Sequence, residues 1–376
     1  MSQAAIHRFA FPTPIHFGPG ASRLVAAHLK KAGCERPLIV TDKGIAALPL
    51  LSGFVSQFSD LKASVFSGVL GNPVASQVRA GADAYRAHDA DSVIGFGGGA
   101  ALDVAKAVAL MAVHPGDVLG YAWDHPQVRP IDKPLPHFVA LPTTAGTGSE
   151  VGRSSVISED DTHVKRIIFN AALLAKAVFA DPELTLGLPP AVTAATGMDA
   201  LTHNVESYLS PAYHPLCDGI ALEGTRIAAR ALPLAFREPK NLQARGDMLM
   251  ASMMGAIAFQ KDLGAVHSCA HALSTVADLH HGLANAMMID HVMRFNREAA
   301  PEKFAELARV AGQKDLVIFL ENLKKEIGIP GNLKPLGVKA EHVPRLVDIA
   351  EKDICHQTNP RPCTRADFER LFRAAL

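Results

Sequence analysis

The sequence predicts an α/β region with a parallel sheet over residues 1–187 and an all-α region over residues 188–376. In the first half, short β-branched runs alternate with helical segments, which is typical of βαβ units. Beyond Leu188-Pro-Pro190 these runs give way to segments rich in Ala, Leu and Met that Pro and Gly separate. A chain of 376 residues is also long enough for two domains.

In the first half, each predicted strand ends at residues that break strands. The predicted strands are Pro37–Thr41, Ser64–Ser67, Asp91–Phe96 and His137–Leu141. Helical spacing of apolar or small residues predicts helices at Val78–His88 and Ala100–Val113. In the second half, helices are predicted at 191–209, 217–235, 241–260, 264–277, 282–297, 301–311, 315–326, 340–352 and 364–375.

Composition excludes several classes of function. Lys+Arg and Asp+Glu are 37 each, so the chain has no net charge to attract nucleic acid. Apolar runs such as Ala107–Val113 are far shorter than the roughly 18 residues that span a bilayer. The five cysteines form no C-x-x-C pair, and the first residues show no secretory pattern. We therefore expect a cytoplasmic protein with reduced thiols and without nucleic-acid or membrane partners.

A glycine turn, Gly97–Gly99, joins a predicted strand to a predicted helix. Together with Gly95 and Ala100 it formally fits G-x-G-x-x-A, which lets a pyrophosphate approach the backbone at a helix N-terminus. A purely structural turn is the alternative. Asp42 ends an earlier strand and is a candidate ligand of the adenosine ribose, which would favour NAD over NADP. It precedes the turn instead of following it, so the usual Rossmann layout does not apply, and an N-cap is its simpler interpretation.

The loop Leu141–Glu150 holds four hydroxyl side chains and two glycines directly after a predicted strand. Such a loop offers donors and bare backbone to a phosphate or to the nicotinamide ribose. A solvated loop with a helix cap is the alternative.

The helical half carries a possible metal site. Asp199 and His203 lie four residues apart, as do His267 and His271, and His281 begins a later helix. Three imidazoles and one carboxylate suit Fe²⁺ or Zn²⁺. A single histidine is more often structural, and spacing alone does not show that these pairs converge.

These motifs resemble those of the iron-containing (group III) alcohol dehydrogenases. Gly97–Lys106 is similar to their G-G-G-S-x-x-D-x-A-K turn, and Leu141–Val151 to their L-P-T-T-A-G-T-G-S-E-V loop. Ala195–His203 resembles the helix of their metal Asp and first metal His, and Gly264–Leu273 with His281-Gly282 resembles their later ligand motifs. Asn359-Pro-Arg361 resembles a motif near their C-terminus, so the resemblance runs from about Pro12 to the end.

The resemblance implies a dinucleotide-binding domain, a helical domain of dehydroquinate synthase-like architecture, and a site between them. The implied metal ligands are Asp199, His203, His267 and His281. His271 would lie outside this set, near the nicotinamide, and help to relay the alcohol proton. The implied cofactor-binding residues are Asp42, Asn72, Gly97, Gly98, Gly99, Asp103, Thr143, Thr144, Thr147, Ser149 and Lys165.

The implied activity is reversible hydride transfer between a primary alcohol or diol and its aldehyde. NAD is favoured over NADP, and Fe²⁺ is favoured by the family name although Zn²⁺ suits the same ligands. A homodimer is implied as well. Cys355 matches a position near the substrate, although a small buried side chain is an equal interpretation. Ser154 and Phe259 are further candidates to line the pocket.

Other functions stay open. A hydroxyacid–oxoacid transhydrogenase would hold its cofactor tightly, and a lyase of the dehydroquinate-synthase type would need clustered Lys and Arg. A silent NAD-binding protein would not be expected to retain the metal set, and a maleylacetate reductase would normally lack it. Ala100, Gly152 and His280 depart from the family pattern. His280 is a competing candidate ligand, but Gly282, which follows His281, favours His281.

Overall fold

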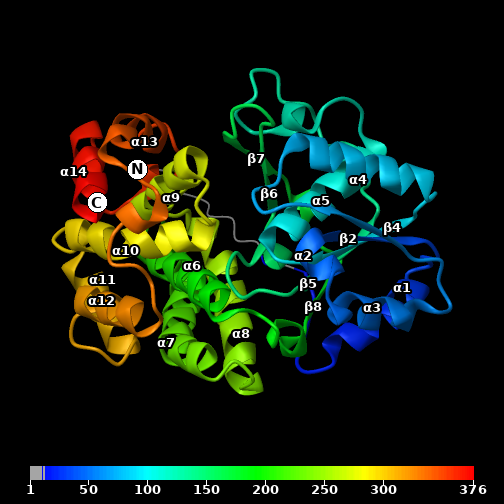
Figure 1. Cartoon of the computed structure of the whole chain (residues 1–376), viewed down its shortest axis with the longest axis horizontal. Helices are drawn as coiled ribbons and strands as arrows, with labels where there is room; N and C mark the ends of the chain where they lie inside the picture. The colour runs from blue at the N-terminus through cyan, green and yellow to red at the C-terminus, as the bar shows by residue number, and fades with distance from the viewer. Residues whose placement is uncertain (1–10, 12) are drawn as a thin grey trace, which may run out of the picture.

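The computed structural model describes Phe11 and residues 13–376. An α/β part and a helical part lie side by side, the first blue to green and the second green to red (Figure 1). The predicted boundary between residues 187 and 188 falls in the short link between the last strand, which ends at Ala180, and the first helix of the helical part, which begins at Pro190. No helix in the described part of the chain is long and apolar enough to cross a membrane.

A six-stranded sheet forms the centre of the α/β part, and its paired strands are all parallel, as predicted. The strands in spatial order are β1 Ile15–Phe17, β8 Ala177–Ala180, β5 His137–Pro142, β4 Ser92–Gly97, β2 Pro37–Asp42 and β3 Ser64–Val69. The predicted strands correspond to β5, β4, β2 and β3, which are adjacent in the sheet. The sequence reading missed β1 and β8, because strands of three and four residues are too short to show a period.

Helices cover both faces of this sheet (Figure 1). Side chains alternate between the faces, so Ile39 belongs to one core and its neighbours Leu38 and Val40 belong to the other. The helices are α1 Val25–Lys31, α2 Lys43–Ala46, α3 Pro49–Val55, α4 Ala75–Ala87 and α5 Gly99–Val113. Only α4 and α5 were predicted, since the others span at most two turns.

An antiparallel hairpin, β6 Ser154–Ser158 and β7 Lys165–Phe169, stands apart from the main sheet. It packs on α5 through the buried Ile157 and Ile168. It was not predicted, because Ser-Ser-Val-Ile-Ser lacks the alternation of a half-buried strand. Short 3₁₀ helices connect the larger elements: η1 Ala21–Leu24, η2 Ser56–Phe58, η3 Val118–Tyr121, η4 Ser149–Val151, η5 Ala171–Leu173, η6 Pro182–Thr185, η7 Phe259–Lys261, η8 Lys334–Leu336, η9 Ala340–His342 and η10 Cys355–Thr358.

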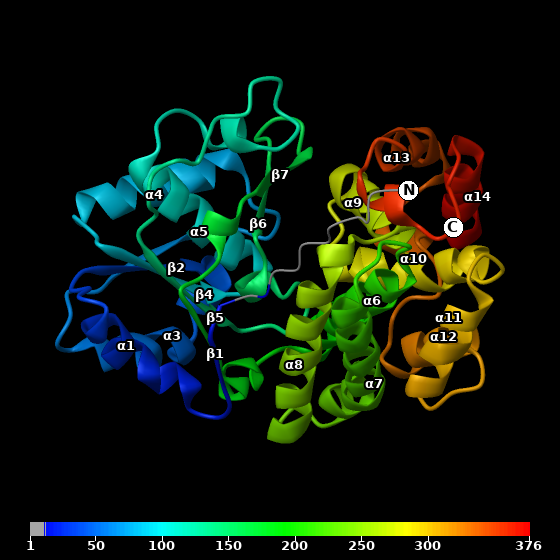
Figure 2. The same cartoon turned by 180° about the vertical axis from the view of Figure 1, so that it is seen from behind.

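The helical part follows the predicted order of helices and is seen from behind in Figure 2. Its helices are α6 Pro190–Leu209, α7 Pro215–Arg237, α8 Leu242–Ala258, α9 Ala265–Ala277, α10 His281–Asn296, α11 Pro301–Val310, α12 Leu316–Glu326, α13 Val343–Ala350 and α14 Arg365–Ala375. The central helix is α6, which packs against α7, α8 and α10. Its side chains are buried almost all round, so polar residues on it must find partners inside the protein.

Candidate metal and cofactor site

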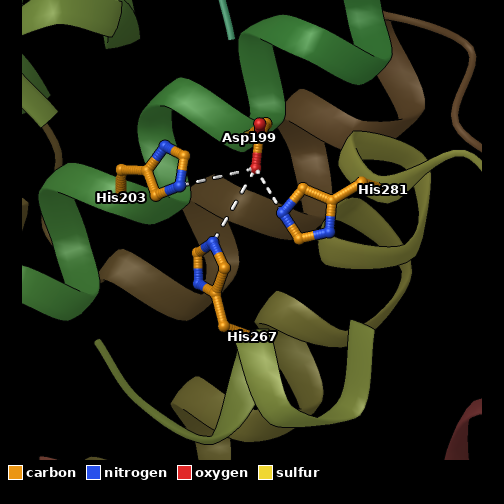
Figure 3. Close-up of side chains that lie close together, drawn as sticks. All are labelled: Asp199, His203, His267 and His281. Atoms are coloured by element: carbon orange, nitrogen blue, oxygen red, sulfur yellow. Dashed lines mark ion pairs between the residues drawn. The ribbon is translucent and has the colours of Figure 1, made fainter. Parts of the chain in front are cut away.

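The four predicted metal ligands converge in the helical part. Asp199 and His203 come from α6, His267 from α9 and His281 from the first turn of α10 (Figure 3). One ligand atom from each lies within 4.8 Å of the others. His280, the N-cap of α10, lies outside this group, so the structure selects His281 from the pair.

The spacing of these atoms fits a divalent metal. Asp199 Oδ1 lies 3.9 Å from His203 Nε2, 3.8 Å from His267 Nε2 and 3.5 Å from His281 Nε2. With metal–ligand distances near 2.1 Å, the ligand atoms of a tetrahedral site lie about 3.4 Å apart. A small inward adjustment of these side chains therefore suffices to hold an ion.

The approach of α10 to α6 depends on Gly282. A Cβ at this position would lie 2.4 Å from the backbone oxygen of Ala195 and 3.2 Å from Asp199 Cβ. Only glycine lets the two backbones approach this closely. As a result, His281, the neighbouring residue, reaches the carboxylate of α6.

Glu206, which the sequence reading missed, orients His267. Its Oε2 accepts a hydrogen bond from His267 Nδ1 at 2.6 Å, and its Oε1 accepts one from Val266 N at 2.7 Å. This leaves Nε2 of His267 to face Asp199. Carboxylates commonly fix metal-binding histidines in this way. The sequence spacing could have indicated Glu206, because it follows Asp199 by seven residues and therefore lies on the same face of α6.

Burial keeps two of the imidazoles neutral. It lowers the pKa of His203 to about 4, although the nearby Asp199 opposes the shift. It also lowers the pKa of His281 well below the usual range, with Lys165 and the other histidines acting in the same direction. Neutral imidazoles are the form that binds a metal, so both are ready to do so near pH 7.

His271 lies beside the four ligands and is held by Asp353. Its Nδ1 lies 2.7 Å from Asp353 Oδ2, and its ring stacks on that of His281 with 5.3 Å between centroids. Asp353 Oδ1 accepts hydrogen bonds from Ser268 Oγ and Cys355 N. Burial opposes ionisation of Asp353, but His271 and these donors outweigh it and hold its pKa well below the usual range. The ionised carboxylate leaves Nε2 of His271 available for proton exchange.

Cys355 belongs to the same cluster as His271 and Asp353. Burial and the neighbouring Asp353 raise the pKa of its thiol well above the usual range. It is therefore a neutral thiol at physiological pH, which fits a lining residue better than a nucleophile.

The predicted cofactor motifs meet at the carboxyl edge of the sheet. Gly97 ends β4, Gly98 is the N-cap of α5, and Gly99 begins that helix. Thr143, which follows β5, donates its backbone N–H to Gly97 O at 3.0 Å. The turn and the hydroxyl-rich loop are thereby joined through their backbones.

Short side chains let the two loops touch. A Cβ at Gly98 would lie 3.3 Å from the side chain of Thr144, and one at Gly99 would lie 2.6 Å from Thr147 Cγ2. The second distance is a clash, so a side chain at Gly99 would push the loops apart. Both threonines therefore lie against the N-terminus of α5, where backbone N–H groups favour an anion.

The position of Asp42 is compatible with both interpretations of the sequence, a helix N-cap and a ligand of the adenosine ribose. Its Oδ1 caps α2 by accepting from Ile45 N at 2.8 Å. Its Oδ2 lies beside Gly97, where a Cβ would be 3.4 Å away. One oxygen is therefore used by the helix, and the other faces the glycine turn.

Two predicted residues face the helical part. Asn72 Nδ2 donates to Asp278 Oδ1 at 2.6 Å and so links the two parts of the molecule. Burial lowers the pKa of Lys165 to about 8, although nearby carboxylates, including Asp199 and Asp353, oppose this shift. Lys165 therefore lies within the electrostatic range of the metal ligands.

Asp103 and Ser149 are engaged inside the protein. Ser149 Oγ donates to Asp103 Oδ1 at 2.5 Å and accepts from Lys106 Nζ at 2.8 Å. Asp103 Oδ2 accepts from Val156 N at 3.0 Å, which ties α5 to the hairpin. Asp103 and Lys106 thus anchor the hydroxyl-rich loop to α5 through Ser149.

A pocket lies between the two parts of the molecule, and none of the four metal ligands lines it. Gly152 and Arg153 line it from the α/β part, and Phe259, Gln260 and Asp262 line it from the helical part. The ring of Phe259 lies 5.3 Å from that of His203. Phe259, one of the residues expected to line the substrate pocket, is therefore shared by this pocket and the surroundings of His203.

Comparison with protein families agrees with the resemblance to iron-containing alcohol dehydrogenases seen in the sequence. A model described as iron-containing alcohol dehydrogenase matches residues 12–182. A second, described as Fe-containing alcohol dehydrogenase family, C-terminal, matches residues 193–376.

Individual relatives cover nearly the whole chain. It is 37% identical to the 4-hydroxybutyrate dehydrogenase of Cupriavidus necator, over 97% of this chain and 98% of the relative. It is 37% identical to the 1,3-propanediol dehydrogenase of Klebsiella pneumoniae, over 98% of both. The crystal structure of a 1,3-propanediol oxidoreductase superposes with a TM-score of 0.94 at 36% identity, over 99% of this chain and 100% of that one. A sulfoacetaldehyde reductase from Bifidobacterium kashiwanohense in complex with NAD⁺ gives 0.89 at 29% identity, over 99% of both chains.

Proposed function

The chain belongs to the iron-containing alcohol dehydrogenase family, and from this premise we propose that it transfers a hydride reversibly between a primary alcohol or diol and NAD. The observation that carries the proposal is the convergence of Asp199, His203, His267 and His281 in the helical part. A transhydrogenase, which would pass the hydride to an oxoacid without releasing its cofactor, is the alternative.

We propose Fe²⁺ as the metal, on the basis of the family to which the chain belongs. Three imidazoles and one carboxylate also suit Zn²⁺, so the ligand set supports a divalent ion without choosing between the two. When bound, the ion supplies Lewis-acid polarisation of the substrate oxygen. The four ligands hold and orient that centre, and Glu206 fixes the ring of His267.

His271 is the residue proposed to move the alcohol proton. Asp353 holds its Nδ1, so Nε2 is the nitrogen that can accept the proton and pass it on to solvent. Replacing Asp353 by Asn removes the carboxylate but keeps the shape of the side chain. We expect kcat to fall about tenfold and the KM for NAD to stay constant, because the charge of Asp353 acts on the proton transfer through His271. A fall in bound metal instead of kcat would contradict this assignment.

NAD is proposed to lie along the carboxyl edge of the sheet. The backbone of Gly97–Gly99 and the N-terminus of α5 would hold the pyrophosphate, with Thr143, Thr144 and Thr147 beside it. Asp42 would bind the adenosine ribose through Oδ2 and disfavour the 2′-phosphate of NADP. Asn72 and Lys165 would contact the nicotinamide half, while Asp103 and Ser149 support the loop from behind.

The substrate is proposed to extend from the metal site past Phe259 into the pocket. Arg153 lines this pocket, with its guanidinium over the ring of Phe169 at 5.2 Å from the centroid. A cation there favours alcohols with a polar far end, such as diols or hydroxy acids. The names of the diol and hydroxybutyrate dehydrogenases to which the chain is similar support the same class.

The decisive experiment removes the metal and restores it. The protein is treated with a chelator and reconstituted with Fe²⁺ anaerobically or with Zn²⁺, and NADH is followed with alcohols, diols, hydroxy acids and aldehydes. We expect activity to vanish and to return with Fe²⁺. Binding of NAD without turnover in any arm would contradict the proposal and favour a silent binding protein. Turnover only when an oxoacid is added with the alcohol would favour the transhydrogenase.

We propose further that the protein acts as a cytoplasmic homodimer. This proposal rests on the resemblance to the family alone. Light scattering of the purified chain tests the dimer, and a molar mass of one chain would contradict it.

A further inference from the structure

Three helices of the metal centre each carry a pair of polar residues four positions apart. On α6 the pair is Asp199 and His203, and on α9 it is His267 and His271. On α10, His281 is followed at the same spacing by Asn285. Side chains at this spacing lie on one face of a helix, so Asn285 points to the same centre as His281.

Asn285 contacts three of the four ligand atoms. Its Nδ2 lies 2.7 Å from Asp199 Oδ1, 3.2 Å from His267 Nε2 and 3.3 Å from His281 Nε2. The residue is fully buried. Its carbonyl oxygen Oδ1 is also buried and has no hydrogen-bond partner among the described residues. An unpaired buried oxygen normally destabilises a core. The side chain therefore directs its nitrogen to the metal ligands and leaves its oxygen without a hydrogen bond.

We propose that Asn285 is a fifth, non-ligating member of the metal centre, which orients Asp199 and closes one face of the ligand set. The inference rests on the metal site of the proposed function. An amide nitrogen donates hydrogen bonds but has no free lone pair for a metal, so Nδ2 serves the ligands and not the ion. Its shortest contact is to the only charged ligand, as expected for a hydrogen bond that a carboxylate strengthens.

The orientation of the amide follows from its neighbours. If the amide were turned over, Oδ1 would face the carboxylate of Asp199 and Nε2 of His267, and both are acceptors because the proton of His267 lies on Nδ1 toward Glu206. With Nδ2 in this place, its two hydrogens face these two acceptors. The observed arrangement is therefore the favourable one, even though it leaves Oδ1 unpaired.

The contacts of Asn285 also define which face of the centre it covers. The amide lies against the face formed by Asp199, His267 and His281, and its described contacts do not include His203. The ring of His203 lies instead beside that of Phe259. Asn285 thus covers one face of the ligand set, and the most exposed ligand is His281, whose side chain is 22% exposed and stacks on His271.

Metal binding to two variants tests this role. Asn285→Ala removes the amide and opens the covered face to water. Asn296→Ala is the matched control, because Asn296 is an equally buried asparagine on α10 whose partner is Asn359 instead of a ligand. Each protein is loaded with Co²⁺, whose visible absorption weakens as its coordination number rises. We expect Asn285→Ala to bind Co²⁺ about tenfold more weakly and to absorb less per ion, and the control to match the wild type.

A second variant keeps the test decisive if Asn285→Ala does not fold. Asn285→Asp has the same shape but presents an oxygen with lone pairs to the ion. We expect its Co²⁺ absorption to weaken as the carboxylate becomes an additional ligand, with the NAD binding of the Co²⁺-loaded protein close to wild type. Wild-type affinity and spectrum in either folded variant would overturn the role of Asn285. A wild-type protein that binds no divalent metal would instead overturn the proposed function.

Discussion

The α/β part contributes mainly backbone and short side chains to the site, whereas the helical part contributes imidazoles and carboxylates. The glycine turn and the hydroxyl-rich loop meet through a backbone hydrogen bond and through contacts that leave no room for a Cβ at Gly99. The metal ligands come from three helices and depend on the placement of individual side-chain atoms.

This difference separates two ways in which a site is built. The surface proposed for NAD is made of two loops in backbone contact, so its shape depends on the lack of a Cβ atom at the glycines. The metal centre depends on partners that hold each ligand, such as Glu206 behind His267 and Asn285 beside Asp199. Changes in one part are therefore expected to spare the binding function of the other, and the following variants test that separation.

The largest effect is expected from His203→Ala. Loss of one of four ligands should leave less than one metal ion in ten chains and lower kcat about 10³-fold, since Lewis-acid assistance is worth several kcal/mol. Metal analysis and NADH production measure both quantities. The Kd for NAD should stay within about twofold of the wild type. Equal loss of NAD binding would break the comparison, because it would show that the two parts are not independent.

Glu206→Gln should weaken metal binding about 10- to 100-fold without removing any ligand. The amide can still accept from Val266 N, but it no longer provides a charged acceptor for His267 Nδ1. Competition with a chelator of known affinity measures the change. Glu302→Gln, at an exposed position of α11, is the control and should bind metal as the wild type does. If both variants bind equally, Glu206 has only a structural role.

Gly99→Ala should weaken NAD binding about tenfold, because its Cβ would meet Thr147 at 2.6 Å and separate the two loops. Quenching of protein fluorescence by NADH reports the affinity, and metal content should not change. Gly53→Ala makes the same chemical change in α3, where a Cβ has nothing within 4 Å. Unchanged NAD affinity in Gly99→Ala would mean that the proposed cofactor surface lies elsewhere.

The smallest effect is expected from Lys165→Arg. Because the pKa of Lys165 is lowered to about 8, the wild-type ammonium loses its proton above that pH, whereas arginine keeps its charge. The KM for NAD should therefore rise a few-fold from pH 7 to pH 9.5 in the wild type and stay nearly flat in the variant. The same rise in both proteins would exclude Lys165 as its source.

The features that the sequence predicts well are those formed by consecutive residues. The glycine turn, the hydroxyl-rich loop and the helix pairs were all visible as local patterns, as were the central strands. The convergence of the pairs was not, since it depends on close contacts such as that of Gly282 with Ala195. The hairpin that carries Lys165 was missed because its strands lack a clear alternation.

The residues that orient the metal ligands and His271 differ in how readily the sequence predicts them. Glu206 and Asn285 stand at helical spacing from a ligand, so a search for polar residues on the ligand faces would have found them. Asp353 gives no such signal, because it lies in the segment after α13, far along the chain from His271. Its role follows only from the fold that brings the two side chains within 2.7 Å of each other.

The pairing of polar residues on three helices restricts where the chain can change length. One inserted residue rotates everything beyond it on a helix by about 100°. An insertion between Asp199 and His203, or between His281 and Asn285, would turn one member of the pair away from the other. The connections between helices carry no such restriction, so members of this family that differ in length should do so at the segments 210–214 and 297–300 and not within α6, α9 or α10.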